Sequence, residues 1–300
     1  MTSVAVIINP ISGTGGRPET ATQRAALARA ALDERGIDGI VSLTERGRHA
    51  CELARAAADS GVPLVIAWGG DGTVNEVASE LAFHDVALGI VPSGSGNGLA
   101  RELRIPFDPA AALRVAFDGA DRVIDAGEID GRLFFNIAGV GLDARVAHEF
   151  AANGLVKRGL SQYLRIAARE LWAFEADEHT IVADGLPIVR TRALLVALAN
   201  GRQYGNGACI APLARLDDGR LDVVIVADRS PFAALLATPM LFARQVARVT
   251  GVTMVSATDV EITSARPVMY HIDGEPFVGG ASLTARVRPN ALRVRVPRAR

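Results

Sequence analysis

The first part of the chain alternates between short apolar runs and longer segments in which apolar residues recur about every 3.6 positions. The short runs have the length of buried strands, and the longer segments are typical of helices with one buried face. The predicted order is strand 3–8, helix 18–35, strand 39–44, helix 48–60, strand 63–68, helix 73–83 and strand 86–91. Repeated strand, loop and helix units predict a parallel sheet with helices on both faces.

From about residue 121 the pattern changes to alternating strand-like segments separated by Asp-Gly pairs, which are a strong hairpin signal. The segments lie at 121–129, 132–139, 178–184, 187–199, 221–227, 253–263, 267–272 and 282–287, with helices near 143–150, 158–175 and 230–245. We therefore expect two domains. These are an α/β nucleotide-binding domain over 1–124 and an antiparallel β-sandwich domain over 125–300.

Composition narrows the class of protein. The 300 residues include 32 basic and 33 acidic side chains, and the net charge of −1 gives no electrostatic case for binding nucleic acid. Cys51 and Cys209 do not form a Cys-x-x-Cys pair, so a reducing, cytoplasmic setting is the simpler interpretation. No secretory signal is indicated at the N-terminus. The apolar segment 232–243 falls short of the roughly 20 residues that a spanning helix needs.

Three loops rich in glycine and small hydroxyl residues follow predicted strands. They are 9–16, 69–73 and 92–98. The carboxyl ends of parallel strands meet at one edge of a sheet, where ligands usually bind. Glycine lets a bulky anion approach the backbone amides, and the start of the following helix favours phosphate. The three loops therefore predict a phosphate-binding edge.

Asp71 stands among the glycines of the second loop, where its charge would repel a phosphate. A divalent metal or a donor hydroxyl between the two would account for it. An ordinary tight turn is the alternative, since Asp-Gly is common turn chemistry.

Two kinds of nucleotide enzyme are excluded. The P-loop motif requires a lysine after its glycine, whereas the only lysine in the chain is Lys157, followed by Arg158. A protein kinase is excluded because its strand lysine and His-Arg-Asp loop are missing. Gly139-Val140-Gly141 lacks the third glycine of a dinucleotide fingerprint and is interpreted as structural.

Four ordered motifs resemble those of the diacylglycerol kinase catalytic family, which includes bacterial lipid kinases and the sphingosine and ceramide kinases. The motifs are Asn9-Pro10-x-Ser12-Gly13, Gly69-Gly70-Asp71-Gly72-Thr73-x-Asn75-Glu76, Pro92-x-Gly94-Ser95-Gly96-Asn97 and Asp273-Gly274-Glu275. The resemblance extends over nearly the whole chain. One departure concerns Gly98-Leu99-Ala100, where many bacterial members carry an Asp, and it puts the identity of the acceptor lipid in doubt.

The resemblance implies a two-domain, NAD kinase-like fold with ATP in the cleft between the domains. The residues that it implies for the nucleotide are Asn9, Pro10, Ser12, Gly13, Thr44, Gly69, Gly70, Gly72, Thr73, Asn75, Glu76, Ser95, Gly96 and Asn97. It also implies that Asp71 acts through Mg²⁺ and that Glu275 is the general base. A second, structural Mg²⁺ is implied at Asp218 with the backbone carbonyls of Arg215 and Arg220.

The function expected is an ATP-dependent lipid kinase that docks at the inner face of a membrane. A kinase for a soluble hydroxyl compound, such as an NAD kinase, and a non-catalytic nucleotide- or lipid-binding regulator are the alternatives. The segments 150–160 and 232–242 are candidate membrane contacts, although buried core is the preferred interpretation of both. Trp68 and Trp172 are also expected in the core. A homodimer is compatible with the sequence.

Overall fold

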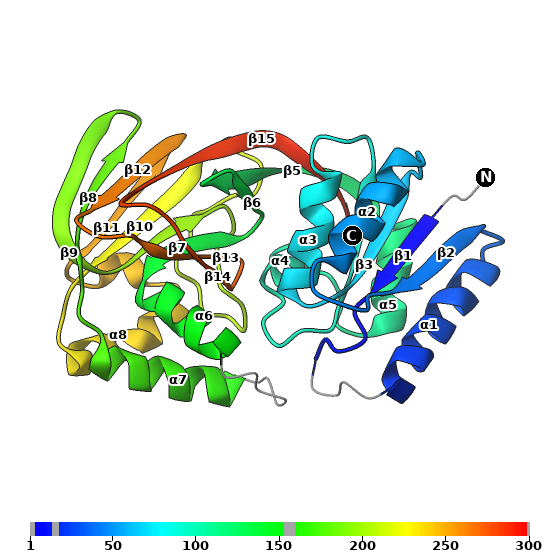
Figure 1. Cartoon of the computed structure of the whole chain (residues 1–300), viewed down its shortest axis with the longest axis horizontal. Helices are drawn as coiled ribbons and strands as arrows, with labels where there is room; N and C mark the ends of the chain where they lie inside the picture. The colour runs from blue at the N-terminus through cyan, green and yellow to red at the C-terminus, as the bar shows by residue number, and fades with distance from the viewer. Residues whose placement is uncertain (1–3, 14–17, 153–159, 299–300) are drawn as a thin grey trace. The chain divides into compact units, whose positions relative to one another are not determined.

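The computed structural model describes residues 4–13, 18–152 and 160–298 (Figure 1). Its chain forms two compact units. The first unit holds the described residues up to Ile124 together with those from Asn290 onward, and the second holds the described residues from Asp125 to Pro289. No helix within the described ranges combines the length and the apolar character needed to cross a bilayer.

The first unit is built on a parallel sheet in the order β2-β1-β3-β4. Its strands are β1 (Val4–Ile8), β2 (Gly39–Leu43), β3 (Leu64–Gly69) and β4 (Ala87–Pro92). Every residue of β1, β3 and β4 is buried, as expected for strands covered on both faces. The far end of β15 (Ser282–Val296) adds a further parallel strand beside β4, where Arg293 lies opposite Ala87.

Helices cover this sheet in two pairs whose members contact each other. One pair is α1 (Pro18–Asp33) with α5 (Pro109–Asp118), and the other is α2 (His49–Asp59) with α3 (Asp71–Leu81). A short helix, α4 (Gly98–Glu102), follows β4. The sequence pattern did not predict α4 or α5. The start of α5 is clear in hindsight, because Asp108 caps the amide of Ala111 and proline occupies the first turn.

The second unit is an antiparallel sandwich. Its strands are the second half of β5 (Ala120–Ile129), then β6 (Arg132–Phe134), β7 (Ile137–Gly141), β8 (Glu178–Ala183), β9 (Leu186–Ala199), β10 (Leu221–Ala227), β11 (Val252–Ala257), β12 (Asp259–Ser264), β13 (Met269–Ile272), β14 (Glu275–Val278) and the first half of β15. The first half of β9 pairs with β8 and its second half with β7 and β10, so this long strand contributes to both layers. The helices are α6 (Leu142–Ala152), α7 (Leu160–Ala173), α8 (Pro231–Phe242) and the 3₁₀ turn η1 (Val246–Arg248).

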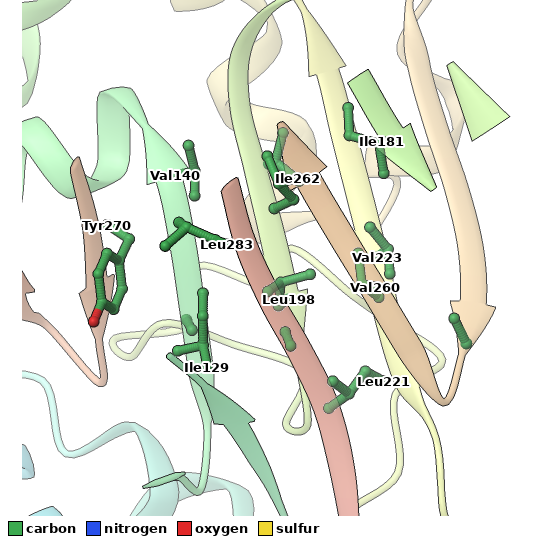
Figure 2. Packing of buried hydrophobic residues seen from close by; sticks show 14 of the residues in the cluster. Ile129, Val140, Ile181, Leu198, Leu221, Val223, Val260, Ile262, Tyr270 and Leu283 are labelled. Carbon is green, nitrogen blue, oxygen red and sulfur yellow. The ribbon is translucent and has the colours of Figure 1, made fainter. Parts of the chain in front are cut away.

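The core of the sandwich lies between its strand layers. Figure 2 shows side chains from β7, β9, β12 and β15 in one buried cluster, represented by Val140, Leu198, Ile262 and Leu283. All four are almost completely shielded from solvent. The expected fold class, a parallel α/β domain followed by an antiparallel β-sandwich, is confirmed.

Three details differ from the sequence-based expectation. The predicted strand 132–139 is broken between β6 and β7, because the amides of Phe135 and Asn136 donate to the Asp273 carboxylate. The predicted strand 253–263 is broken at Thr258, whose amide donates to Asp184. The expected second domain, 125–300, included the last residues of the chain, whereas residues from Asn290 onward lie in the first unit because β15 continues into its sheet.

Candidate active site

The carboxyl ends of three neighbouring strands bring three loops together in the first unit. Because β1, β3 and β4 are adjacent and parallel, the residues that follow them share one edge of the sheet. The predicted residues at this edge are Asn9, Pro10, Ser12 and Gly13 after β1, Gly69, Gly70, Asp71, Gly72 and Thr73 at the β3–α3 junction, and Ser95, Gly96 and Asn97 after β4. Thr44 follows β2 and is tied to β1, because its amide donates to the carbonyl of Ile8.

Side-chain hydrogen bonds join the loops in pairs. The Asn9 Nδ2 donates to Thr73 Oγ1 at 2.9 Å, which connects the first loop to α3. The hydroxyls of Ser12 and Ser93 lie 2.6 Å apart and connect the first loop to the third. The loops are therefore held in place before any ligand binds, which reduces the entropy that a ligand must overcome.

Glycine is required where the loops touch. A Cβ on Gly94 would lie 2.6 Å from the Cα of Gly70, so the second and third loops are in backbone contact. A Cβ on Gly13 would lie 2.5 Å from the Ser93 carbonyl oxygen, and Gly13 has a φ of +89°. Side chains at these positions would push the loops apart and close off the backbone amides that a phosphate would approach.

Asp71 holds the second and third loops together. Its Oδ2 accepts a hydrogen bond from the amide of Asn97 at 2.8 Å, and its Oδ1 accepts one from the amide of Gly98 at 2.6 Å. A carboxylate at the first turn of α4 is also favoured by the orientation of the amide dipoles. The sequence predicts a divalent metal or a donor hydroxyl between Asp71 and a phosphate, and that stays a prediction. The partners that the structure shows are these two backbone amides.

Arg24 is a basic residue at this edge that the motif analysis missed. From α1, its guanidinium donates to the Asn9 carbonyl at 2.9 Å, to Ser12 Oγ at 3.0 Å and to the Ser12 carbonyl at 2.9 Å. Partial burial lowers the pKa of this guanidinium from its ordinary value, yet arginine stays protonated in proteins. In a chain with one lysine, a search for arginine on the helix after the first loop would have found it.

We expect Arg24→Met to weaken ATP binding about 10- to 100-fold, because hydrogen bonds to charged groups contribute about 1.5–3 kcal/mol and the first loop would lose its anchor. Isothermal titration of the protein with ATP and Mg²⁺ measures the change. Arg29→Met removes an exposed arginine from the same helix and serves as the matched control. Equal affinity in the two variants would contradict the assignment.

Two other predicted nucleotide residues have partners elsewhere. Glu76 lies on α3, and its carboxylate accepts hydrogen bonds from the backbone at Arg48 and Ala50, at the start of α2. Burial raises the pKa of Glu76 in spite of these bonds. Asn75 Oδ1 accepts a long hydrogen bond, 3.4 Å, from Ser79 within α3. The contacts of Glu76 therefore support α2–α3 packing.

In the second unit, the turn between β13 and β14 carries the motif Asp273-Gly274-Glu275. The Asp273 carboxylate accepts hydrogen bonds from the amides of Phe135, Asn136 and Ile137, each at 3.0 Å. The Asp273 amide in turn donates to the Ile137 carbonyl. Asp273 therefore fixes the turn to the β6–β7 connection. Glu275 opens β14 with an exposed side chain, opposite Ile272 in the hairpin.

A buried polar cluster that sequence reasoning missed lies beneath this turn. The His271 Nδ1 accepts from the Gly274 amide at 3.3 Å, so its Nε2 carries the proton and donates to Asp143 Oδ2 at 3.3 Å. The Tyr204 hydroxyl donates to the same oxygen at 3.0 Å. A Cβ on Gly139 would lie 2.0 Å from Asp143 Oδ2, which explains the glycine there as structural.

The proposed structural metal site lies in the turn before β10. Asp218 is exposed, and its Oδ1 accepts from the Arg220 amide at 3.2 Å. The buried Asp125 holds the turn through the Gly219 amide at 2.7 Å. Burial and then the nearby Asp218 charge raise the pKa of Asp222. Carboxylate and carbonyl oxygens suit Mg²⁺. No group of three His, Cys, Asp or Glu side chains suited to a metal occurs in the described part of the chain.

Comparison with known proteins places these features in a family. Residues 3–129 match the model of the diacylglycerol kinase catalytic domain, and residues 136–296 match that of the YegS C-terminal NAD kinase beta sandwich-like domain. A probable lipid kinase YegS-like protein of Pseudomonas aeruginosa is 34% identical over 284 residues, which cover 91% of this chain and 89% of the relative. A diacylglycerol kinase of Mycobacterium tuberculosis is 32% identical over 245 residues, covering 80% and 78%.

Solved structures share the fold. A diacylglycerol kinase from Bacillus anthracis matches with a TM-score of 0.72 and 20% identity, covering 98% of this chain and 97% of that chain. An NAD kinase from Archaeoglobus fulgidus in complex with ATP matches with a TM-score of 0.54 and 12% identity, covering 97% and 93%. The two family models together match residues in both units, and so do the alignments with the curated relatives. The chain therefore belongs to the family of diacylglycerol kinases and YegS-like lipid kinases, and it is a phosphotransferase.

Proposed function

We propose that this kinase transfers the γ-phosphoryl group of ATP to a hydroxyl of diacylglycerol or a similar membrane lipid, with Glu275 as general base. The observation that carries the proposal most directly is the pair of amides that Asp71 holds between the β3 and β4 loops. This arrangement leaves glycine backbone at a sheet edge where a polyphosphate can lie. Phosphoryl transfer depends mainly on such positioning and on charge neutralisation.

The donor would be held by the first unit. Backbone amides of the glycine loops, with Asn9, Ser12, Thr44 and Ser95, would contact the nucleotide, and Arg24 would keep the first loop in place. Mg²⁺ would neutralise the phosphates when bound. Carboxylate oxygens are ligands that suit Mg²⁺ and its bound waters, and Asp71 stands beside the glycine loops that would hold the phosphates.

The acceptor would be activated by the second unit. A lipid hydroxyl is a weak nucleophile at neutral pH, so a carboxylate that removes its proton increases the rate by about 10²–10⁴. Glu275 is suited to this role because it is exposed and follows a turn that Asp273 anchors with three backbone hydrogen bonds. The proton would pass from the hydroxyl to the Glu275 carboxylate as the new P–O bond forms, while the bond from the γ-phosphorus to the bridging oxygen breaks and ADP leaves.

A second Mg²⁺ is proposed in the turn before β10, held by Asp218 and the carbonyls of Arg215 and Arg220. Supporting it are the exposed carboxylate of Asp218 and the fixed turn around it, in which the buried Asp125 accepts a hydrogen bond from the Gly219 amide at 2.7 Å. Because the proposed substrate is a membrane lipid, we further propose that the protein works in the cytoplasm, at the inner face of the membrane.

The reaction is tested by transfer of labelled γ-phosphate from ATP to a panel of lipids in detergent mixed micelles. We expect a labelled product from diacylglycerol or a related lipid alcohol, and loss of that product when Mg²⁺ is chelated. NAD and other soluble hydroxyl compounds serve as the competing acceptors. Labelling of a soluble compound alone would replace the lipid assignment, and ATP binding without any labelled acceptor would favour a regulator.

A further inference from the structure

Apart from Thr238, the helix α8 consists of apolar residues, and yet none of its residues is buried. Its twelve residues, Pro231–Phe242, include no charged side chain. Phe232, Leu235 and Leu236 are 65%, 52% and 63% exposed. A helix that is hydrophobic all round normally lies in a protein core or in a membrane. The preferred expectation that residues 232–242 form core is therefore wrong, because the segment lies on the surface of the second unit.

One side of α8 packs on its own unit and the other side faces outward. Ala234 and Leu241 pack against the buried cluster of β9 and β10. The exposed residues lie on one half of the helix surface, which we call the α8 face: Phe232, Ala233, Leu235, Leu236, Pro239, Met240, Phe242 and Ala243. A contiguous exposed apolar surface of this kind indicates a contact with a partner or a membrane.

The segment that carries the α8 face is basic, and the neighbouring helix carries an exposed tryptophan. From Arg229 to Thr258 the sequence contains three arginines, at 229, 244 and 248, and no Asp or Glu, although the whole chain has a net charge of −1. Arg244 and Arg248 are exposed just beyond the helix. Trp172, on the neighbouring helix α7, is 62% exposed, so its expected place in the core is also wrong.

These features fit an anionic lipid surface. Tryptophan is enriched at membrane interfaces, and arginines beside an apolar face favour anionic headgroups. At 1.5 Å per residue α8 is about 18 Å long, too short to span a bilayer, so it would lie in the interfacial plane. Pro239 also removes the amide that would bond the Leu235 carbonyl, and such a carbonyl is best accommodated at the hydrated interface.

A second copy of the chain fits this face less well. In a symmetric dimer each patch meets its own copy, so two segments carrying Arg244 and Arg248 would be brought together. Like charges brought together in this way are unfavourable.

The position of α8 within its unit agrees with a lipid substrate. Helix α6 contacts both strands of the hairpin that carries Glu275, α6 contacts α7, and α7 contacts α8. In Figure 1 these three helices lie together along the lower side of this unit. A membrane bound by α8 would therefore be met by the same helical layer that adjoins the proposed acceptor site.

We propose that the α8 face, with Trp172 and the flanking arginines, inserts into the headgroup region of an anionic bilayer and docks the enzyme on the surface that holds its substrate. The inference about the substrate rests on the function proposed above, whereas the docking itself does not.

The test uses the full chain and vesicles of phosphatidylcholine with or without phosphatidylglycerol. We expect Leu235→Ser/Leu236→Ser to weaken vesicle binding in a flotation assay about tenfold or more. Leu27→Ser/Leu186→Ser changes two exposed leucines elsewhere and should bind like the unmodified chain. Arg244→Glu/Arg248→Glu should remove the preference for phosphatidylglycerol. Unchanged binding in the α8 variant would overturn the proposal.

Tryptophan fluorescence provides a second readout. Trp68 is buried in the first unit, so a blue shift on vesicle addition should come from Trp172 and should disappear in Trp172→Phe. If the face instead covers a second copy, sedimentation would show a dimer that the α8 variant dissociates and no vesicle binding, and the proposal would be wrong.

Activity separates docking from chemistry. The α8 variant should keep its activity on a short-chain, water-soluble diacylglycerol, while its activity on vesicle-borne diacylglycerol should fall together with binding. If vesicle binding depends on α8 but no lipid is phosphorylated, the docking proposal would be supported and the lipid kinase proposal would be refuted. Equal loss of activity on both substrates would show that the substitutions damage the enzyme itself, and would contradict a role limited to docking.

Discussion

Glu275→Gln is expected to lower kcat for lipid phosphorylation by about 10²–10⁴, the usual contribution of a general base. The substitution keeps the size and shape of the side chain but removes its ability to accept the proton of the acceptor hydroxyl. Because the Glu275 side chain is exposed and the turn is held by Asp273, the fold should be unaffected. Steady-state kinetics in mixed micelles, with thermal unfolding alongside, measure both quantities.

The matched control for this variant is Glu261→Gln, which removes an exposed carboxylate from β12 in the same unit. Its kcat should stay within about twofold of the unmodified enzyme, as is usual for surface substitutions away from a site. The affinity of Glu275→Gln for ATP should also be unchanged. A kcat within tenfold of normal would exclude Glu275 as the base, as would a change confined to KM.

Asp71→Asn should reduce kcat/KM for ATP by about 100-fold or more, the scale seen when a preorganised electrostatic group is removed. Both carboxylate oxygens of Asp71 accept hydrogen bonds from backbone amides, whereas asparagine offers one oxygen and an NH₂ group that can only donate. One amide of the third loop would therefore face a donor, at a cost of about 1–3 kcal/mol. Titration with ATP and Mg²⁺, together with chemical denaturation, tests both effects.

Asp38→Asn, an exposed aspartate just before β2, provides the control for a lost surface charge. The comparison also separates two roles of Asp71. A variant that is destabilised but binds ATP–Mg²⁺ normally would limit Asp71 to holding the loops. A variant of normal stability with weak, magnesium-insensitive ATP binding would assign it to the metal. Normal stability together with normal ATP binding would show that the enzyme needs this carboxylate for neither role.

The parallel half of the fold follows directly from local sequence. The apolar run expected at 63–68 is strand β3 at Leu64–Gly69, because a strand buried on both faces must be apolar throughout. The break between β6 and β7 could not be foreseen, because it depends on a carboxylate 138 positions from Phe135. The length of β15 was missed for a similar reason, since its second half is stabilised by β4.

Motifs located the three loops that share one edge of the parallel sheet but not the residues that support them. Glycines and small hydroxyl residues are recognisable in sequence because the backbone geometry demands them. No local sequence motif identifies Arg24 or the His271–Asp143 pair, because their roles depend on contacts between segments that are distant in the sequence. Glu76 shows that a residue within a motif can also support helix packing, through its bonds to the start of α2. Hydrophobicity also misled at α8, since an apolar segment suits a core and a lipid surface equally well.

The path of β15 has a consequence for how the protein is made. The first unit begins at the N-terminus, yet its sheet lacks the strand beside β4 until the residues from Asn290 onward have been synthesised. On the ribosome, the second unit is complete in sequence before the first can close its sheet. During that interval the open edge of β4 exposes unpaired backbone, a recognised start for aggregation. The second half of β15 thus acts as a late closing strand, and termination of the chain before Arg293 would leave the earliest-made part of the protein unfinished.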